Sequence, residues 1–297
     1  MKSDWMPMLN NGFHSRVTLI LHSVLFLTLF TTSLEAAPRA DLWPRWQQYD
    51  PASTQRVDHS TWQAFLEAYV VDPHPSGISR VRYGAVAVVD KQRLRKYLEQ
   101  MQAITVSHLN RKEQLAYWIN LYNATTLNVV LEHFPVQSIR DITVSSGFLS
   151  KLFGAGPWQA PLLTIEGQPL SLDDIEHRIL RPIWRDNRIH YAVNCASLGC
   201  PDLQREAFTG SNTERLLNDG ARAYINHPRG VSLHNGDLQL SQIYNWFQED
   251  FEGSEQGVLT HLRQHAEPAL RQRLDGHVGD ISYNYDWSLN DALGDGT

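Results

Sequence analysis

Residues 110–135 read NRKEQLAYWINLYNATTLNVVLEHFP, and this stretch decides the fold. Asn110 has the character of a helix cap, and Pro135 ends the helical pattern. Between Leu115 and Leu131 apolar side chains fall on every face of the predicted helix. A surface helix has a single apolar stripe, so this pattern indicates a long helix buried at the centre of the protein.

Asparagines interrupt this apolar helix at positions 120, 123 and 128. A buried amide left without a partner costs about 1–3 kcal/mol, so each needs hydrogen bonds. Two interpretations remain open at this point. Asn120 and Asn123 either tie the helix to neighbouring segments or line a polar binding pocket.

The flanking sequence predicts further helices and a few strands. A capping box at Ser60 and Gln63 predicts a helix to about residue 71, and Asp90 predicts a cap for a helix to about residue 102. Further helices are expected over 171–181, 213–227, 241–247 and 258–274, hairpins over 162–170 and 231–240 (with a type I′ turn at Asn235-Gly236), and strands over 188–194 and 281–287. Because no βαβ rhythm is present, we expect the α+β class, a mostly helical single domain around a small antiparallel sheet.

Residues 1–36 have the features of a secretory signal peptide. Arg16 precedes an apolar run from Val17 to Phe30, and small residues follow up to Ala36 and Ala37. The run is shorter than the roughly 20 residues that span a bilayer as a helix. We therefore expect cleavage after Ala36 and a periplasmic or secreted protein.

The rest of the chain is expected to be soluble, with no stable membrane insertion after cleavage. Residues 37–75 would form an N-terminal arm and a first helix packing on the main domain at 76–297. A net charge of −6 gives no attraction to phosphate backbones, so we expect no nucleic-acid partner. The expected partner is an unidentified small molecule or envelope protein.

The stretch HYAVNCASLGCP, residues 190–201, contains both cysteines of the chain. In an oxidising compartment, Cys195 and Cys200 are able to form a disulfide that fixes the turn between them. A zinc site would need both cysteines and two distant histidines, and no short ligand pair is present. We predict no metal and no cofactor.

A nucleophilic thiol is the second interpretation of the same stretch. Cys195 would attack, His190 or His177 would act as the base, and Glu176 would orient the imidazole. Turn amides would hold the developing oxyanion. The candidate binding residues are Asn120, Asn123, Arg181 and Ser197.

Four motifs together resemble the domain of unknown function 547, a protein family. They are Glu113–Ala124, Asp174–His177 with Arg181, His190–Pro201, and Ser241–Phe251 with Asp250. The resemblance extends from about Tyr83 to Phe251.

The resemblance implies no established activity. Plant relatives carry the domain beside coiled-coil segments, which implies protein interaction, but this chain lacks heptads. Those relatives match Cys200 less well than Cys195, which weighs against an obligatory bridge. We expect a non-catalytic binding or structural module of the cell envelope with a disulfide or buried cysteine pair. The alternative is a cysteine-dependent hydrolase or acyl transferase.

Overall fold

A computed structural model describes residues 38–144, 156–234 and 236–292. The predicted signal peptide and position 235 of the predicted turn lie outside these ranges. Within them, no helix combines the length and the apolar character needed to cross a membrane.

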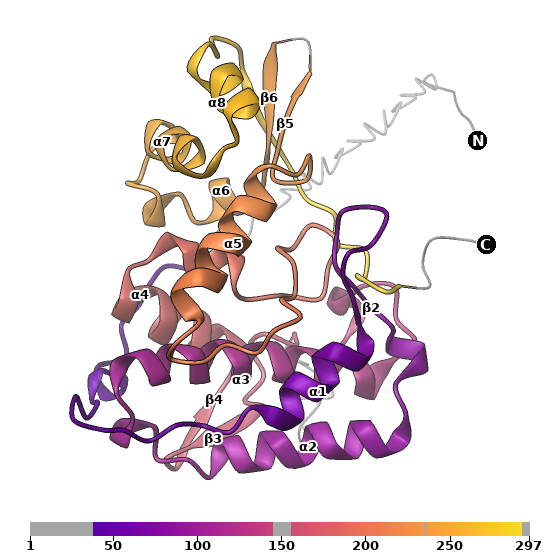
Figure 1. Ribbon diagram of the computed structural model, residues 1–297, viewed down its shortest axis with the longest axis vertical. Coiled ribbons are helices and arrows are strands. Elements are labelled where there is room, and N and C mark those ends of the chain that lie inside the picture. The colour runs from indigo at the N-terminus through magenta and orange to yellow at the C-terminus, as the bar shows by residue number, and fades with distance from the viewer. Residues whose placement is uncertain (1–37, 145–155, 235, 293–297) are drawn as a thin grey trace, which may run out of the picture. The chain divides into compact units, whose positions relative to one another are not determined.

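The described residues are mainly helical (Figure 1), which agrees with the α+β class. The α-helices are α1 (Ser60–Tyr69), α2 (Val88–Gln102), α3 (Arg111–His133), α4 (Arg181–Trp184), α5 (Thr213–Ile225), α6 (Ile243–Trp246), α7 (Glu255–His265) and α8 (Pro268–Asp275). Short 3₁₀ helices are η1 (Pro44–Gln47), η2 (Tyr83–Ala85), η3 (Val106–His108), η4 (Ile139–Asp141), η6 (Asn187–Tyr191) and η7 (Gln248–Asp250). The element η5 (Asp174–Leu180) is a π-helix.

The strands form three small sheets. Two are antiparallel pairs, β1 (Val70–Val71) with β2 (Arg80–Val81) and β3 (Leu163–Ile165) with β4 (Gln168–Leu170). The third joins β5 (Val231–His234), β6 (Asp237–Ser241) and β7 (Ile281–Asn284). β6 pairs antiparallel with β5 but parallel with β7. The prediction of a purely antiparallel sheet is therefore wrong for this sheet, because β7 returns from a distant segment rather than through a hairpin.

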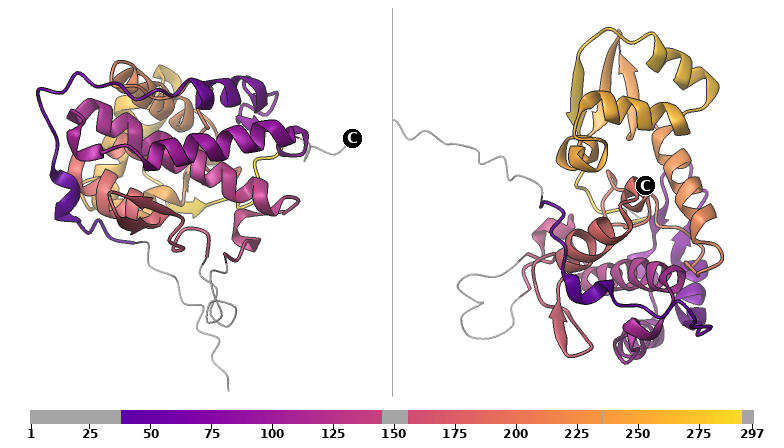
Figure 2. Two further views of the ribbon diagram at one scale, coloured as in Figure 1. Left: turned by 90° about the horizontal axis from the view of Figure 1, so that it is seen from below. Right: turned by 90° about the vertical axis from the view of Figure 1, so that its left-hand side faces the viewer.

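Helix α3 packs against α2 on one side and against η5 and α5 on others. Asn110 caps α3 by accepting a hydrogen bond from the backbone N–H of Glu113, and most side chains from Glu113 to Leu131 are buried. The core around α3 also takes in α1 and α2, and a second hydrophobic cluster joins α5, α7 and α8 to the β5–β6–β7 sheet. Figure 2 shows α1–α3 gathered at one end of these residues and α7, α8 and the mixed sheet at the other.

Three local predictions differ from the structure. The Ser60–Gln63 capping box is not formed, because His59 occupies the cap position and the Gln63 amide donates to Glu67 and Arg205 instead. Asp90 lies in the first turn of α2 rather than at its cap. Residues 187–191 form the 3₁₀ helix η6 rather than a strand, with Asp186 accepting from the Arg188 amide at its start.

Candidate functional site

The backbone around Cys195 is held by asparagine side chains. Asn123 of α3 donates to the Ala192 carbonyl and accepts from the Asn194 amide, both at 2.8 Å. Asn194 in turn accepts from the Ala196 amide and donates to the Pro201 carbonyl. These bonds connect α3 directly to the turn that carries Cys195.

Asn120, one turn earlier on α3, makes a similar connection elsewhere. Its amide donates to the Phe208 carbonyl at 2.7 Å and accepts from the Phe208 amide at 3.0 Å. Both asparagines are buried and bind backbone through both ends of their carboxamide.

Three side chains surround the thiol of Cys195, and together with it they form the thiol cluster: Cys195, Cys200, Ser197 and Tyr285. The two Sγ atoms lie 2.8 Å apart. The hydroxyls of Ser197 and Tyr285 lie 3.2 and 3.1 Å from the Cys195 sulfur. Cys195 is partly exposed, whereas Cys200 is buried.

This environment makes the two thiols unequal. Burial opposes ionisation of Cys195, but hydrogen bonds from Cys200, Ser197 and Tyr285 outweigh it and lower the pKa of Cys195 below its usual range. Burial raises the pKa of Cys200 well above its usual value, and the neighbouring Cys195 raises it further. Cys195 is therefore the thiol that ionises first, and Cys200 is its proton donor.

Both cysteines are free thiols, so the predicted disulfide is not formed in this structure. Their sulfur separation exceeds the roughly 2.05 Å of an S–S bond. Among the described residues, no three histidine, cysteine or carboxylate side chains gather in a way that would hold a metal ion.

The amides of the Cys195 turn are already engaged within the protein. Those of Cys195 and Ala196 donate to Cys200 Sγ and Asn194 Oδ1. Those of Leu198 and Gly199 donate to carbonyls at 288 and 286, and the Ser197 amide bonds to the Cys195 sulfur itself. An oxyanion hole of the kind expected from the sequence would first have to break one of these bonds.

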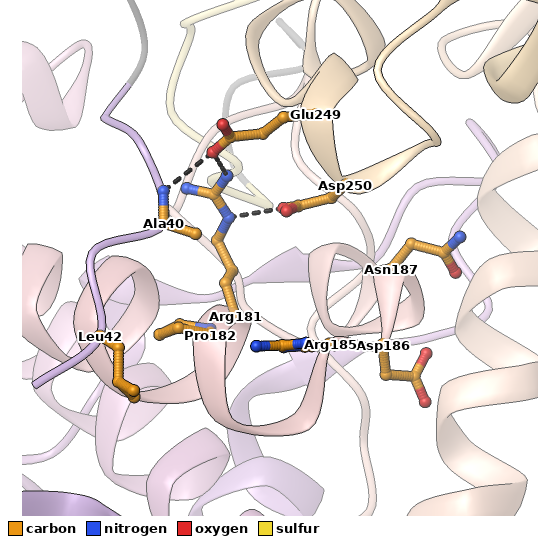
Figure 3. A pocket seen from close by; sticks show the side chains of 9 residues that line it. All are labelled: Ala40, Leu42, Arg181, Pro182, Arg185, Asp186, Asn187, Glu249 and Asp250. Atoms are coloured by element: carbon orange, nitrogen blue, oxygen red, sulfur yellow. Dashed lines mark hydrogen bonds and ion pairs between the residues drawn. The ribbon is translucent and has the colours of Figure 1, made fainter. Parts of the chain in front are cut away.

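A second group of polar side chains, called here the ionic cluster, lies on η5, α4, η6 and η7: Glu176, His177, Arg181, His190, Glu249 and Asp250. Arg181 is buried and donates to Asp250 at 2.6 Å and to Glu249 at 2.9 Å (Figure 3). It also donates to the Pro38 carbonyl at 2.7 Å. His190 bonds to the same oxygen of Asp250 at 2.7 Å, while Glu176 lies 3.9 Å from its other ring nitrogen. The π-helical winding of η5, a geometry frequent at functional sites, carries Glu176 and His177 into this cluster.

The protonation states of Asp250 and His177 follow from their neighbours in the ionic cluster. Burial acts against ionisation of Asp250, but His190 and Arg181 hold its pKa at about 2. Burial lowers the pKa of His177 to about 4, and its ring lies 3.0 Å from an Arg181 nitrogen. Asp250 is thus a carboxylate and His177 a neutral imidazole at neutral pH.

The structure brings Glu176, His177, Arg181 and His190 together, and it groups Cys195 with Cys200 and Ser197. Within the described residues, neither His190 nor His177 hydrogen-bonds to Cys195. Aromatic rings connect the two clusters: His190 stacks on Phe247, Phe247 adjoins Trp246, and Trp246 packs on Tyr285.

Tyr285 is a site residue that sequence reasoning missed. It lies 90 positions from Cys195, just beyond β7, and no local pattern marks it. Glu249 was missed for the same reason, while Asp250 entered only as part of a family motif.

Fold and site together define an α+β protein that carries a free dithiol and an ionic cluster centred on the buried Arg181. Residues 106–225 match the model of a family described as protein of unknown function, DUF547. The match covers α3, η5 and the cysteine turn, and it is narrower than the range suggested by the motifs. No curated protein and no solved structure matches the chain.

Proposed function

We propose that the thiol cluster is a thiol–disulfide exchange site. The observation that carries the proposal is the 2.8 Å contact between a partly exposed thiol and a buried one. Dithiol exchange needs an accessible thiolate that attacks and a second thiol close enough to resolve the mixed disulfide. Cys195 and Cys200 have these two roles.

In the first step, the Cys195 thiolate attacks one sulfur of a substrate disulfide, and the other sulfur leaves as a thiolate and takes up a proton. Cys200 then attacks the Cys195 sulfur, and its proton passes to the departing substrate sulfur, which leaves as the second thiol. The substrate disulfide has gained two electrons and two protons, and this chain has become the Cys195–Cys200 disulfide. A reducing dithiol returns it to the starting state.

The alternative is acyl transfer or hydrolysis at Cys195 with His190 or His177 as base. It is less well supported, because His190 is bonded to Asp250 and His177 to Arg181. The amides of the turn are also engaged within the protein. Exchange chemistry requires neither a base nor an oxyanion hole, since the thiolate itself attacks.

We further propose that the protein is exported, as residues 1–36 indicate, and acts in an oxidising compartment of the cell envelope. There its substrates would be proteins with disulfides. A purely structural bridge between the same two cysteines is the competing role.

Trapping tests the proposal. Cys200→Ser keeps an attacking thiol but removes the resolving one, so it should accumulate mixed disulfides with a model peptide disulfide. Cys195→Ser, the matched control, should trap nothing because Cys200 is buried. Equal trapping by both variants, or by neither, would contradict the proposal.

The reduction potential separates exchange from a structural bridge. The full chain would be equilibrated in glutathione buffers, and its thiols counted by mass after alkylation. Structural disulfides have potentials below about −300 mV, and catalytic ones lie higher. A reduction potential below about −300 mV would assign the Cys195–Cys200 disulfide a structural role.

A further inference from the structure

A cavity of about 480 Å³ is lined in part by Arg181 (Figure 3). Its walls come from the arm, from α4 and the segment after it, and from η7. The lining residues are Ala40, Leu42, Arg181, Pro182, Arg185, Asp186, Asn187, Glu249 and Asp250. This volume falls within the range of small-molecule binding pockets.

Several of the charged side chains that line the cavity already form ion pairs within the protein. Arg181 is bonded to Glu249 and Asp250, as described above. Both oxygens of Asp186 accept hydrogen bonds from Arg188. The Arg181 guanidinium and the Asp186 carboxylate shape the cavity but have little capacity left for a ligand.

Three polar groups remain available to a ligand. Among the described residues, the exposed Arg185 guanidinium makes no ion pair, and the Asn187 carboxamide makes no hydrogen bond. Asp250 accepts both of its side-chain bonds on Oδ2, which leaves Oδ1 available. One cation, one carboxylate oxygen and one amide therefore line the same cavity.

The backbone of Arg185 supports a role other than stability. It ends α4 in the left-handed region, at φ 52° and ψ 37°. Glycine or asparagine is the usual residue at such a helix end, because a Cβ is unfavourable there. The chain has an arginine at a position where glycine would be better tolerated.

We infer that this cavity binds a short peptide with free ends, its carboxylate on Arg185 and its ammonium group on Asp250. Asn187 is positioned to bond the peptide link, and Leu42 and Pro182 supply the apolar wall for a side chain. Opposite fixed charges in one cavity favour a zwitterion over an anion or a cation, because each end of the ligand is compensated. The volume exceeds what a single small amino acid fills.

The test is calorimetric titration of the full chain with L-alanyl-L-leucine and its two capped forms. N-acetylation removes the ammonium charge, and amidation removes the carboxylate. Each cap should weaken binding about ten- to hundredfold, the usual effect of losing a charged hydrogen bond. No binding of the free dipeptide at millimolar concentration, or equal binding of all three peptides, would overturn the inference.

Variants of Arg185 test whether this residue binds the carboxylate of the peptide. Arg185→Gln should weaken binding of the free dipeptide by a similar factor and abolish its advantage over the amidated form. Arg185→Gly should weaken binding of the free dipeptide by the same factor without lowering the Tm of the protein. Such a result would attribute the weaker binding to the missing guanidinium rather than to unfolding. Arg95→Gln, a matched charge change on the exposed face of α2, should leave binding unchanged. Undiminished binding by Arg185→Gln would contradict the assignment.

Discussion

Ala196, next to the attacking thiol, has an unusual backbone. Its φ is 61°, in the left-handed region that costs an L-residue about 1–2 kcal/mol. The Asn194 side chain accepts its amide hydrogen, and the neighbouring Ser197 forms a β-bridge with Leu289. Backbone strain of this kind concentrates at functional sites, and here it turns the chain so that Cys195 and Ser197 both face Tyr285.

Tyr285→Phe should slow alkylation of Cys195. The lost hydroxyl stabilises the thiolate, so its removal raises the pKa of Cys195 and shifts the pH–rate curve upward. A hydrogen bond worth about 1 kcal/mol corresponds to a rate near neutral pH lower by roughly fivefold. The measurement is iodoacetamide reactivity as a function of pH.

Tyr283→Phe is the control for this measurement, because Tyr283 bonds to the exposed Glu255 on another part of the surface. It should leave the curve in place. An unshifted curve for Tyr285→Phe would show that Tyr285 does not support the thiolate.

Single elements differ in how well their sequences predict them. The hairpin around Glu166-Gly167 depends on short-range turn chemistry and is confirmed as β3–β4. Residues 188–194 alternate as a strand would, yet residues 188–191 lie in η6, where His190 is buried like its apolar neighbours. His190 is buried because of Asp250, 60 positions away, and no local pattern contains that partner.

Helix α3 offers a matched pair of variants. Asn123→Ala and Asn120→Ala each remove two bonds to buried backbone groups, so each should destabilise the protein by about 2–4 kcal/mol. Only Asn123→Ala should also change the alkylation rate of Cys195, because Asn123 holds the amide of Asn194. Urea unfolding and thiol kinetics measure the two effects.

The same rate change in both variants would be incompatible with this division of roles. It would mean that the alkylation rate of Cys195 depends on the stability of α3 as a whole rather than on the hydrogen bonds of Asn123.

At the scale of the whole molecule, the site is assembled from distant segments. Sequence motifs identified Cys195, His190, His177, Glu176 and Arg181 as polar and chemically capable residues. They did not reveal that His190 pairs with Asp250 and His177 with Arg181, while the Cys195 thiol contacts Tyr285. That grouping depends on where β7 and η7 return to the core, which long-range packing decides.

Stability should fall as the pH drops below about 6.5. Burial lowers the pKa of His59 and His177 to about 4 and that of His261 to about 3. At pH values between these folded-state pKa values and 6.5, the folded state therefore binds fewer protons than the unfolded chain. Each histidine should cost about 1.4 kcal/mol between pH 7.5 and 5.5.

Urea unfolding at the two pH values measures this loss. His59→Gln should reduce the loss by about 1.4 kcal/mol, the contribution of one such histidine. An unchanged loss in that variant would exclude His59 as a contributor.

Export makes a separate prediction about the mature chain. Expressed in a bacterium with a periplasm, the protein recovered from that compartment should begin at Ala37, as read from its intact mass. Full-length protein confined to the cytoplasm would refute the signal peptide.

The arm has a consequence for the order of events during synthesis. The Pro38 carbonyl and the Ala40 amide bond to Arg181 and Glu249, residues that the ribosome adds more than 140 and 200 positions later. Pro38 and Ala40 therefore cannot form these hydrogen bonds until nearly the whole chain has been synthesised, because contacts between residues far apart in the sequence form late in folding. If the chain is exported as proposed, an uncleaved signal peptide still held at the translocation channel would keep Pro38 away from Arg181, and these last contacts of the fold would form only after cleavage.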